Sequence, residues 1–144
     1  MIAVDTNLLV YAHRRDSPWF EPSRRALRHL IEGTATWAIP WPCVHEFLAI
    51  STHPKIYRPP TELPRALEQV TALFASPSLL VLSEPASYWP VLERLLAAGQ
   101  VTGAKVHDAR IAALCLCHGV SELWSADRDF TRFPELKTRN PLLS

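Results

Sequence analysis

The sequence has few cysteines, no long apolar run and no excess of charge of either sign. Three cysteines among 144 residues are too few for a disulfide framework and suit a reducing cytoplasm. No stretch of about 18 apolar residues is present to span a membrane. The first residues, Met-Ile-Ala-Val-Asp, lack the basic segment and cleavage site of a signal peptide. We therefore expect a cytoplasmic protein with no membrane partner.

The charge is balanced, with 15 Lys and Arg against 14 Asp and Glu and a net charge of +1. This balance argues against a nucleic-acid coat protein or a polybasic membrane binder, although it allows a local basic patch. Only Lys55, Lys105 and Lys137 are lysines, so the cations are mostly arginines, which suit bidentate contacts to phosphate or carboxylate. The length and the hydrophobic fraction of 48% predict a single domain over residues 1–144.

Short apolar segments alternate with segments of helical periodicity. We predict strands at residues 2–4, 37–39, 79–82 and 122–124, with a fifth near 137–138. We predict helices at residues 6–15, 22–31, 42–50, 61–75 with Thr61 as the N-cap, 88–98 ended by Gly99, and 106–117. This alternation indicates an α/β protein, a three-layer α/β/α domain with a short-stranded parallel sheet. Ligands of such folds bind beyond the carboxyl ends of the strands.

Two aspartates follow predicted strands. Asp5 ends the first strand, and Asp127 comes a few residues after the fourth. Each also has a purely local explanation, because Asp5 could cap the helix that follows and Asp127 and Asp129 could be turn residues. Taken singly, these residues leave both interpretations open.

Two further acids lie on apolar helix faces. Glu46 shares a face with Phe47 and Ile50, and Asp108 shares one with Ile111. A carboxylate in apolar surroundings is costly unless it is paired or bound to a metal. Glu46 could instead reach water at the edge of its face, and Asp108 could be a first-turn acid favoured by the helix dipole.

The four acids together predict a metal site. Carboxylates that converge cannot all stay ionised without cations between them. Mg²⁺ and Mn²⁺ prefer oxygen ligands. We therefore expect a divalent-metal site that acts on a phosphate.

Four segments carry these acids in order along nearly the whole chain: V-D-T-N at 4–7, V-H-E-F at 44–47, V-H-D-A-R-I-A-A at 106–113 and W-S-A-D-R-D-F at 124–130. Each segment alone is a weak signal, but the ordered set resembles the PIN-domain ribonucleases, and most closely the VapC toxins of bacterial type II toxin–antitoxin pairs. The resemblance implies a PIN-like fold and an Mg²⁺- or Mn²⁺-dependent endoribonuclease.

The resemblance also implies roles for particular residues and partners. The catalytic acids would be Asp5, Glu46, Asp108 and Asp127, with the metal contacts at Asp5 and Asp108. Glu46, Asp127 and Asp129 would complete the metal cluster, and Asn7 and Ser125 would support it. The implied partners are an RNA substrate, a cognate VapB-like antitoxin and a second copy of the chain in a homodimer.

Several arginines lie near these segments or on the first two predicted helices. Arg110 and Arg128 are close in sequence to the acids, and Arg14 and Arg15 begin the densest basic region, which continues at Arg24, Arg25 and Arg28. A run of cations is usually a solvated helix face. The functional alternative is contact with RNA phosphates or with acidic residues of the antitoxin.

Three other classes of protein agree less well with the sequence. A phosphatase of the haloacid dehalogenase type needs a second Asp where this chain has Asn7. A phosphoacceptor receiver domain needs an Asp after the third strand, where this chain has Leu82-Ser83-Glu84. A non-catalytic RNA- or protein-binding module on the same fold stays as the alternative, and the complete set of four acids argues against it.

Overall fold

The structure is a computed structural model that describes residues 1–143. One five-stranded sheet, entirely parallel, lies at its centre. Its strand order is β3-β2-β1-β4-β5, and the strands are β1 (Ile2–Val4), β2 (Trp37–Pro40), β3 (Leu79–Leu82), β4 (Glu122–Trp124) and β5 (Thr138–Arg139). The predicted strands are confirmed, with β2 one residue longer and β5 one residue later than expected.

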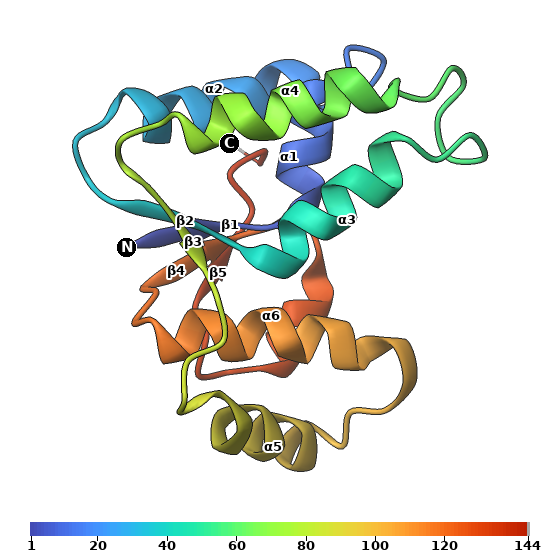
Figure 1. The fold of residues 1–144 in the computed structure, drawn as a ribbon. Coiled ribbons are helices and arrows are strands. Elements are labelled where there is room, and N and C mark those ends of the chain that lie inside the picture. The colour runs from blue at the N-terminus through green and yellow to red at the C-terminus, as the bar shows by residue number, and fades with distance from the viewer. Residues whose placement is uncertain (144) are drawn as a thin grey trace.

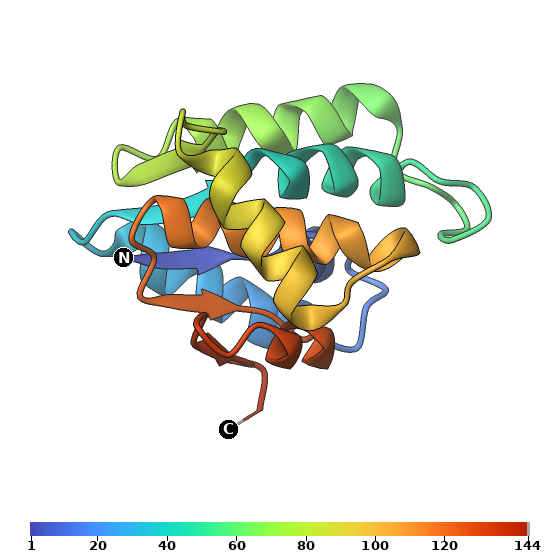
Figure 2. The same ribbon diagram turned by 90° about the horizontal axis from the view of Figure 1, so that it is seen from below.

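Helices cover both faces of this sheet. They are α1 (Thr6–His13), α2 (Phe20–Glu32), α3 (Trp41–Ser51), α4 (Leu63–Phe74), α5 (Tyr88–Gly99) and α6 (Val106–Cys117), with short 3₁₀ helices η1 (Gly103–Lys105) and η2 (Arg128–Arg132). Figure 1 shows α1 to α4 on one side of the sheet and α5 and α6 on the other. Figure 2 shows α5 crossing over α6, so α6 is the helix next to the sheet. The three-layer α/β/α prediction is confirmed.

Small side chains let α6 approach the sheet closely. Ala109, Ala112 and Ala113 are fully buried, and a residue without a long side chain brings its helix axis nearer to its neighbour. Larger residues of the same helix, Ile111 and Leu114, fill the space to either side and are also buried. This close packing fixes the position of Asp108, which belongs to the first turn of the same helix.

Two helix ends differ from the sequence-based expectation. Thr61 does not cap α4, which begins at Leu63 with Glu62 in the N-cap position. The Thr61 hydroxyl instead contacts His13 at 3.0 Å and accepts a bond from Arg14 at 3.2 Å. Tertiary partners thus replace the local capping role.

The ends of α1 and α5 also differ. α1 ends at His13, two residues earlier than predicted. Gly99 is the last residue of α5, and Gln100 takes the left-handed conformation that ends the helix, with φ of 50°.

The neighbouring strands β1 and β4 define where a ligand site is expected. From β1 the chain moves to β2 and β3 on one side, and it later returns to β4 on the other. The carboxyl ends of β1 and β4 therefore flank the switch point of the sheet. The backbone N–H of Asp5 donates to the carbonyl of Trp124 at 3.0 Å, which joins the two ends.

Membrane crossing has no support among residues 1–143, because no helix there is both long and apolar enough.

Candidate active site

Asp5 lies where β1 ends and α1 begins. Its Oδ1 accepts a hydrogen bond from the backbone N–H of Thr6 at 2.8 Å, and its Oδ2 accepts one from the Ser125 hydroxyl at 2.7 Å. The Cys43 thiol donates to Oδ1 at 3.5 Å. Asp5 is therefore the N-cap of α1, but capping accounts for only one of these contacts. The other two come from the residue that follows β4 and from α3, and they hold the carboxylate inside the protein.

Burial raises the pKa of Asp5 from 3.8 to about 6. The residue is only 4% exposed, and removal from water penalises the charged form. Hydrogen bonds from Ser125, Thr6 and Cys43 oppose this rise, and the charge of Glu46 adds to it. A carboxylate that is costly to ionise is one whose charge a bound cation would stabilise.

Glu46 faces Asp5 from α3. The Thr6 hydroxyl donates to Glu46 Oε2 at 2.7 Å, which fixes the carboxylate to the first residue of α1. The adjacent residues Cys43 and Phe47 are buried, and Glu46 is half-buried. Glu46 is thus directed toward the ends of the strands and held there.

Asp108, Asp127 and Asp129 form a second group of acids. Each offers a carboxylate oxygen within 4.8 Å of the others. The Lys105 ammonium pairs with Asp129, and the Asp129 backbone N–H donates to Asp127 at 2.8 Å. Burial, followed by the charge of Asp127, raises the pKa of Asp108, and Lys105 opposes that rise. The tightest acidic cluster therefore surrounds the start of α6.

One cavity, the carboxylate cavity, is lined by Asp5 and Glu46 and by two acids of the second group. It has a volume of about 310 Å³ and is lined by Asp5, Glu46, Asp108 and Asp127. Thr6 and Asn7 complete its polar side. Its remaining wall is apolar or aromatic, from Val10, Tyr11, Ile50, Tyr57 and Ile111. The structure brings the four predicted acids together at the carboxyl ends of the strands.

The donors around this cavity fit a hard divalent cation. They are carboxylate oxygens from α3, α6 and the segments that directly follow β1 and β4, and carboxylate oxygen is the ligand type that Mg²⁺ and Mn²⁺ prefer. Burial is the main cause that raises the pKa of Asp5 and of Asp108, and a bound cation would stabilise the charged form of both.

Asn7 and Ser125 hold the acids in position. Ser125 is buried, and its hydroxyl accepts the Asp127 backbone N–H at 2.9 Å while it donates to Asp5. The Asn7 amide nitrogen is 3.4 Å from both Asp5 and Ser125, and its oxygen accepts the Ala126 N–H at 3.2 Å. These contacts join the end of β1 to the loop after β4.

The four arginines predicted as contacts have different environments. Arg14 donates hydrogen bonds within the chain, to both carboxylate oxygens of Asp16 and to the Pro59 carbonyl at 2.9 Å. Arg110 lines a separate cavity beside Trp41 and Glu84 and does not line the carboxylate cavity. Arg15 and Arg128 are exposed.

Sequence reasoning missed several residues that shape this site: Thr6, Cys43, Lys105, Tyr11 and Tyr57. Lys105 had a possible signal, because it precedes Asp108 by one helical step of three residues. Tyr11 follows Asn7 by four residues on α1, which places both on one face. Tyr57 belongs to a loop, for which periodicity gives no prediction.

The chain belongs to the PIN domain family, whose pattern matches residues 2–136. Ribonuclease VapC43 of Mycobacterium tuberculosis is 32% identical over 142 residues, which covers 99% of this chain and 96% of that protein. Ribonuclease VapC48 of the same species is 29% identical over 137 residues, covering 95% and 94% of the two chains. The chain is thus similar to VapC ribonucleases over nearly its whole length.

Solved structures confirm the fold. VapC20 of Mycobacterium tuberculosis, described as a toxin that cleaves the sarcin–ricin loop, superimposes with a TM-score of 0.68 at 14% identity, over 91% of this chain and 93% of that one. The VapBC2 structure from Rickettsia felis, bound to a DNA fragment from its promoter, gives a TM-score of 0.67 at 20% identity, with 97% and 98% covered.

Proposed function

We propose that this protein is a metal-dependent endoribonuclease and the toxin of a VapBC-type toxin–antitoxin pair. The single observation that supports this most is the carboxylate cavity, where Asp5, Glu46, Asp108 and Asp127 meet at the switch point of the sheet. The similarity to VapC ribonucleases favours RNA as the phosphodiester substrate.

Asp5 and Asp108 would hold Mg²⁺ or Mn²⁺, with Glu46, Asp127 and Asp129 close enough to complete the site. The ion would lower the pKa of a water and stabilise charge that develops on the phosphate. The protein's own part is to orient the acids. Glu46, fixed by the Thr6 hydroxyl, is directed to accept a proton from the attacking water.

An antitoxin of the VapB kind would be the cognate partner. A groove of about 420 Å³ between α2 and α4 combines apolar residues with cations, among them Leu27, Ile31, Arg24, Arg28 and Arg65. Such a surface suits an amphipathic helix that carries acidic residues. An antitoxin arginine placed among the four acids would block the cavity, because it replaces the charge of the metal.

We also propose that the protein acts in the cytoplasm as a homodimer. The three cysteines of the chain are free thiols in the structure, which agrees with a reducing compartment. A strictly monomeric mass in solution would contradict the dimer.

The proposed function is tested by incubating purified protein with RNA in the presence of Mg²⁺ or Mn²⁺. Cleavage should stop with a chelator and in the Asp5→Asn variant, and it should persist in Glu93→Gln, which removes an exposed acid on α5. RNA cleavage that Asp5→Asn leaves unchanged would contradict the assignment. RNA binding without cleavage under any metal would indicate the non-catalytic module.

A further inference from the structure

Two of the three tyrosines of the chain line the carboxylate cavity. Tyr11 on α1 and Tyr57 on the loop between α3 and α4 face it together with Ile50. Tyr88, the third, belongs to α5 on the other side of the sheet. The acids account for one wall of the cavity, and no step of the proposed chemistry uses the aromatic wall.

Tyr57 is held by contacts to both its side chain and its backbone, although its loop is exposed. The Arg14 guanidinium lies over the Tyr57 ring, 4.3 Å from its centroid. Arg14 is itself fixed by Asp16 and by the Pro59 carbonyl. The loop backbone is tied down as well, since the N–H of Tyr57 donates to the His53 carbonyl at 3.0 Å. One face of the ring is therefore covered by a cation, and the ring is fixed in orientation before any ligand binds.

The hydroxyl groups of both tyrosines are available. Within residues 1–143 neither Tyr11 nor Tyr57 uses its hydroxyl in a side-chain hydrogen bond to another residue. Both residues are partly exposed. An aromatic ring with an unused hydroxyl beside a polar cavity can stack on one group and donate to another.

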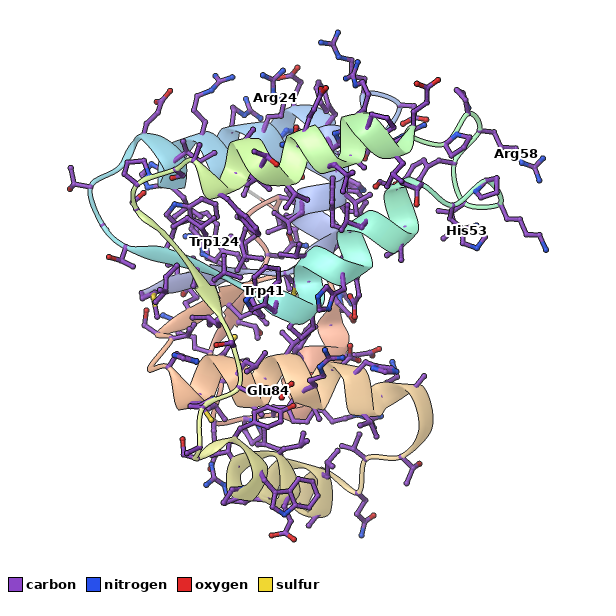
Figure 3. All side chains as sticks on the ribbon, viewed as in Figure 1. Arg24, Trp41, His53, Arg58, Glu84 and Trp124 are labelled. Carbon is purple, nitrogen blue, oxygen red and sulfur yellow. The ribbon has the colours of Figure 1, made fainter. Side chains whose placement is uncertain are left out.

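The loop that carries Tyr57 also presents cations. Lys55 and Arg58 are exposed on either side of it, and Figure 3 shows Arg58 pointing away from the body of the molecule. Exposed cations next to a fixed aromatic ring form the combination that binds single-stranded nucleic acid, in which the cations follow the phosphates and the ring stacks on a base.

We propose that Tyr57, together with Tyr11, forms a nucleobase-binding subsite beside the carboxylate cavity, which holds the base of the nucleotide next to the cleaved bond. This inference rests on the proposed ribonuclease function and names how that site recognises its substrate. An unstacked base of single-stranded RNA fits here, because specific recognition of RNA uses bases that stack on aromatic side chains. Arg14 is the positioning residue, since it fixes the ring plane.

The test is direct binding of a fluorescent single-stranded RNA to the Asp5→Asn chain, which should not cleave. Adding Tyr57→Leu should raise Kd about tenfold, the effect of losing one stacked base. Tyr57→Phe should bind within twofold of the parent, because the ring is kept. Tyr88→Phe is the matched control and should bind like the parent. If Tyr57→Leu binds as tightly as the parent, or Tyr57→Phe loses as much as Tyr57→Leu, the stacking proposal is wrong.

Salt dependence separates stacking from charge. Arg58→Gln should weaken binding and reduce the slope of log Kd against log salt by about 1, as expected for a lost phosphate contact. Tyr57→Leu should weaken binding at every salt concentration with the slope unchanged. A changed slope in Tyr57→Leu would show that the whole loop has moved, and it would overturn the proposal.

An RNA with one base removed identifies the nucleotide involved. Each position near the cleaved bond is made abasic in turn. One such RNA should bind the Asp5→Asn chain about tenfold more weakly, and on that RNA Tyr57→Leu should have no further effect. Arg14→Lys, which loses the bidentate contact to Asp16, should weaken binding of intact RNA but not of the abasic one. Additive losses would contradict a Tyr57–base contact.

The failure of this inference and the failure of the proposed function are distinguishable. If the unmodified protein binds RNA through Tyr57 but never cleaves it, the ribonuclease assignment is wrong and the subsite stands. If it cleaves RNA and Tyr57→Leu changes neither binding nor site preference, only the subsite is wrong. If no RNA binds at all, both are wrong.

Discussion

The Ser125 hydroxyl connects two acids of the carboxylate cavity, because it donates to Asp5 Oδ2 at 2.7 Å and accepts the backbone N–H of Asp127 at 2.9 Å. A hydroxyl that gives its one proton to a carboxylate and takes a backbone proton on its lone pair has a fixed orientation. The end of β1 and the loop after β4 are thereby held in one geometry, and the positions of Asp5 and Asp127 depend on each other.

Ser125→Ala should weaken metal binding. The bond from Ser125 lowers the pKa of Asp5 against the effect of burial, so its loss should raise that pKa further above about 6. Protons would then compete better with the metal. We expect the Mn²⁺ affinity measured by calorimetry to fall at pH 7 and to recover at higher pH. Ser125→Thr keeps the hydroxyl and is the control, and an equal loss in both variants would contradict this explanation.

In the metal-free protein, the acids of the carboxylate cavity should contribute more stability as the pH falls from 7.5 to 5.5. Burial raises the pKa of Asp5 to about 6 and raises that of Asp108, so the folded state binds protons in this range that the unfolded state does not. These two acids therefore contribute stability that rises toward acid pH, by roughly 1 kcal/mol from Asp5 alone. His13 contributes in the opposite direction over the same range, because burial lowers its pKa in the folded state. Asp16 and Glu122 have lowered pKa values, so their stabilising contributions are lost only at more acidic pH.

Thermal unfolding in a chelator checks this pH dependence. Between pH 7.5 and 5.5 the Tm of the parent should rise relative to that of Asp5→Asn, whose amide does not titrate. Saturating Mn²⁺ should raise Tm most at pH 7.5, where the acids are ionised. A change in Tm that is the same in the parent and in Asp5→Asn would show that the pKa of Asp5 is not raised in the folded state.

The positions of the four acids were predictable from the sequence, and most of their surroundings were not. Asp5 and Asp127 follow short predicted strands, and parallel topology places the carboxyl ends of strands at one edge of the sheet. Helical spacing placed Glu46 and Asp108 on apolar helix faces, and the resemblance to PIN-domain ribonucleases then favoured a shared site over the local explanations. The environment of Arg110 could not, because the cavity that it lines also depends on β3 and on the residues that follow it.

Hydrophobic periodicity could not predict the contacts of residues on loops or in ion pairs. Lys105 pairs with Asp129 because η1 and η2 both lie beside α6. No sequence pattern in either segment predicts that contact. The sequence around Tyr57 indicates only a proline-rich loop. Its position on the carboxylate cavity depends on Arg14, which is distant in the sequence and was predicted as an external contact.

Lys105→Gln should increase the affinity of the site for divalent cations. Lys105 pairs with Asp129 and lowers the pKa of Asp108, so it already supplies positive charge where a metal would bind. Removing it leaves more negative charge and frees Asp129. Because the pair is partly exposed, we expect Mn²⁺ to bind only roughly threefold more tightly. Lys137→Gln removes the corresponding partner of Glu122 and is the control. Weaker Mn²⁺ binding in Lys105→Gln would mean that Lys105 holds the acids in place.

The fragments released from RNA should carry a 5′-phosphate and a free 3′-hydroxyl. Histidine does not line the carboxylate cavity in the part of the chain that the structure describes, so an imidazole pair is not available to activate the RNA's own 2′-hydroxyl. The carboxylates are arranged instead to orient a water for in-line attack on phosphorus, with the 3′-oxygen leaving. A single 2′-deoxy substitution at the cleaved nucleotide should therefore leave the chemical step intact, although binding can weaken. The measurement is end-group analysis of the fragments by mass spectrometry, with the Asp108→Asn variant as the blank. Fragments that end in a 2′,3′-cyclic phosphate, or a deoxy substitution that abolishes cleavage without affecting binding, would show that the 2′-hydroxyl is the nucleophile and that the acids have a different task.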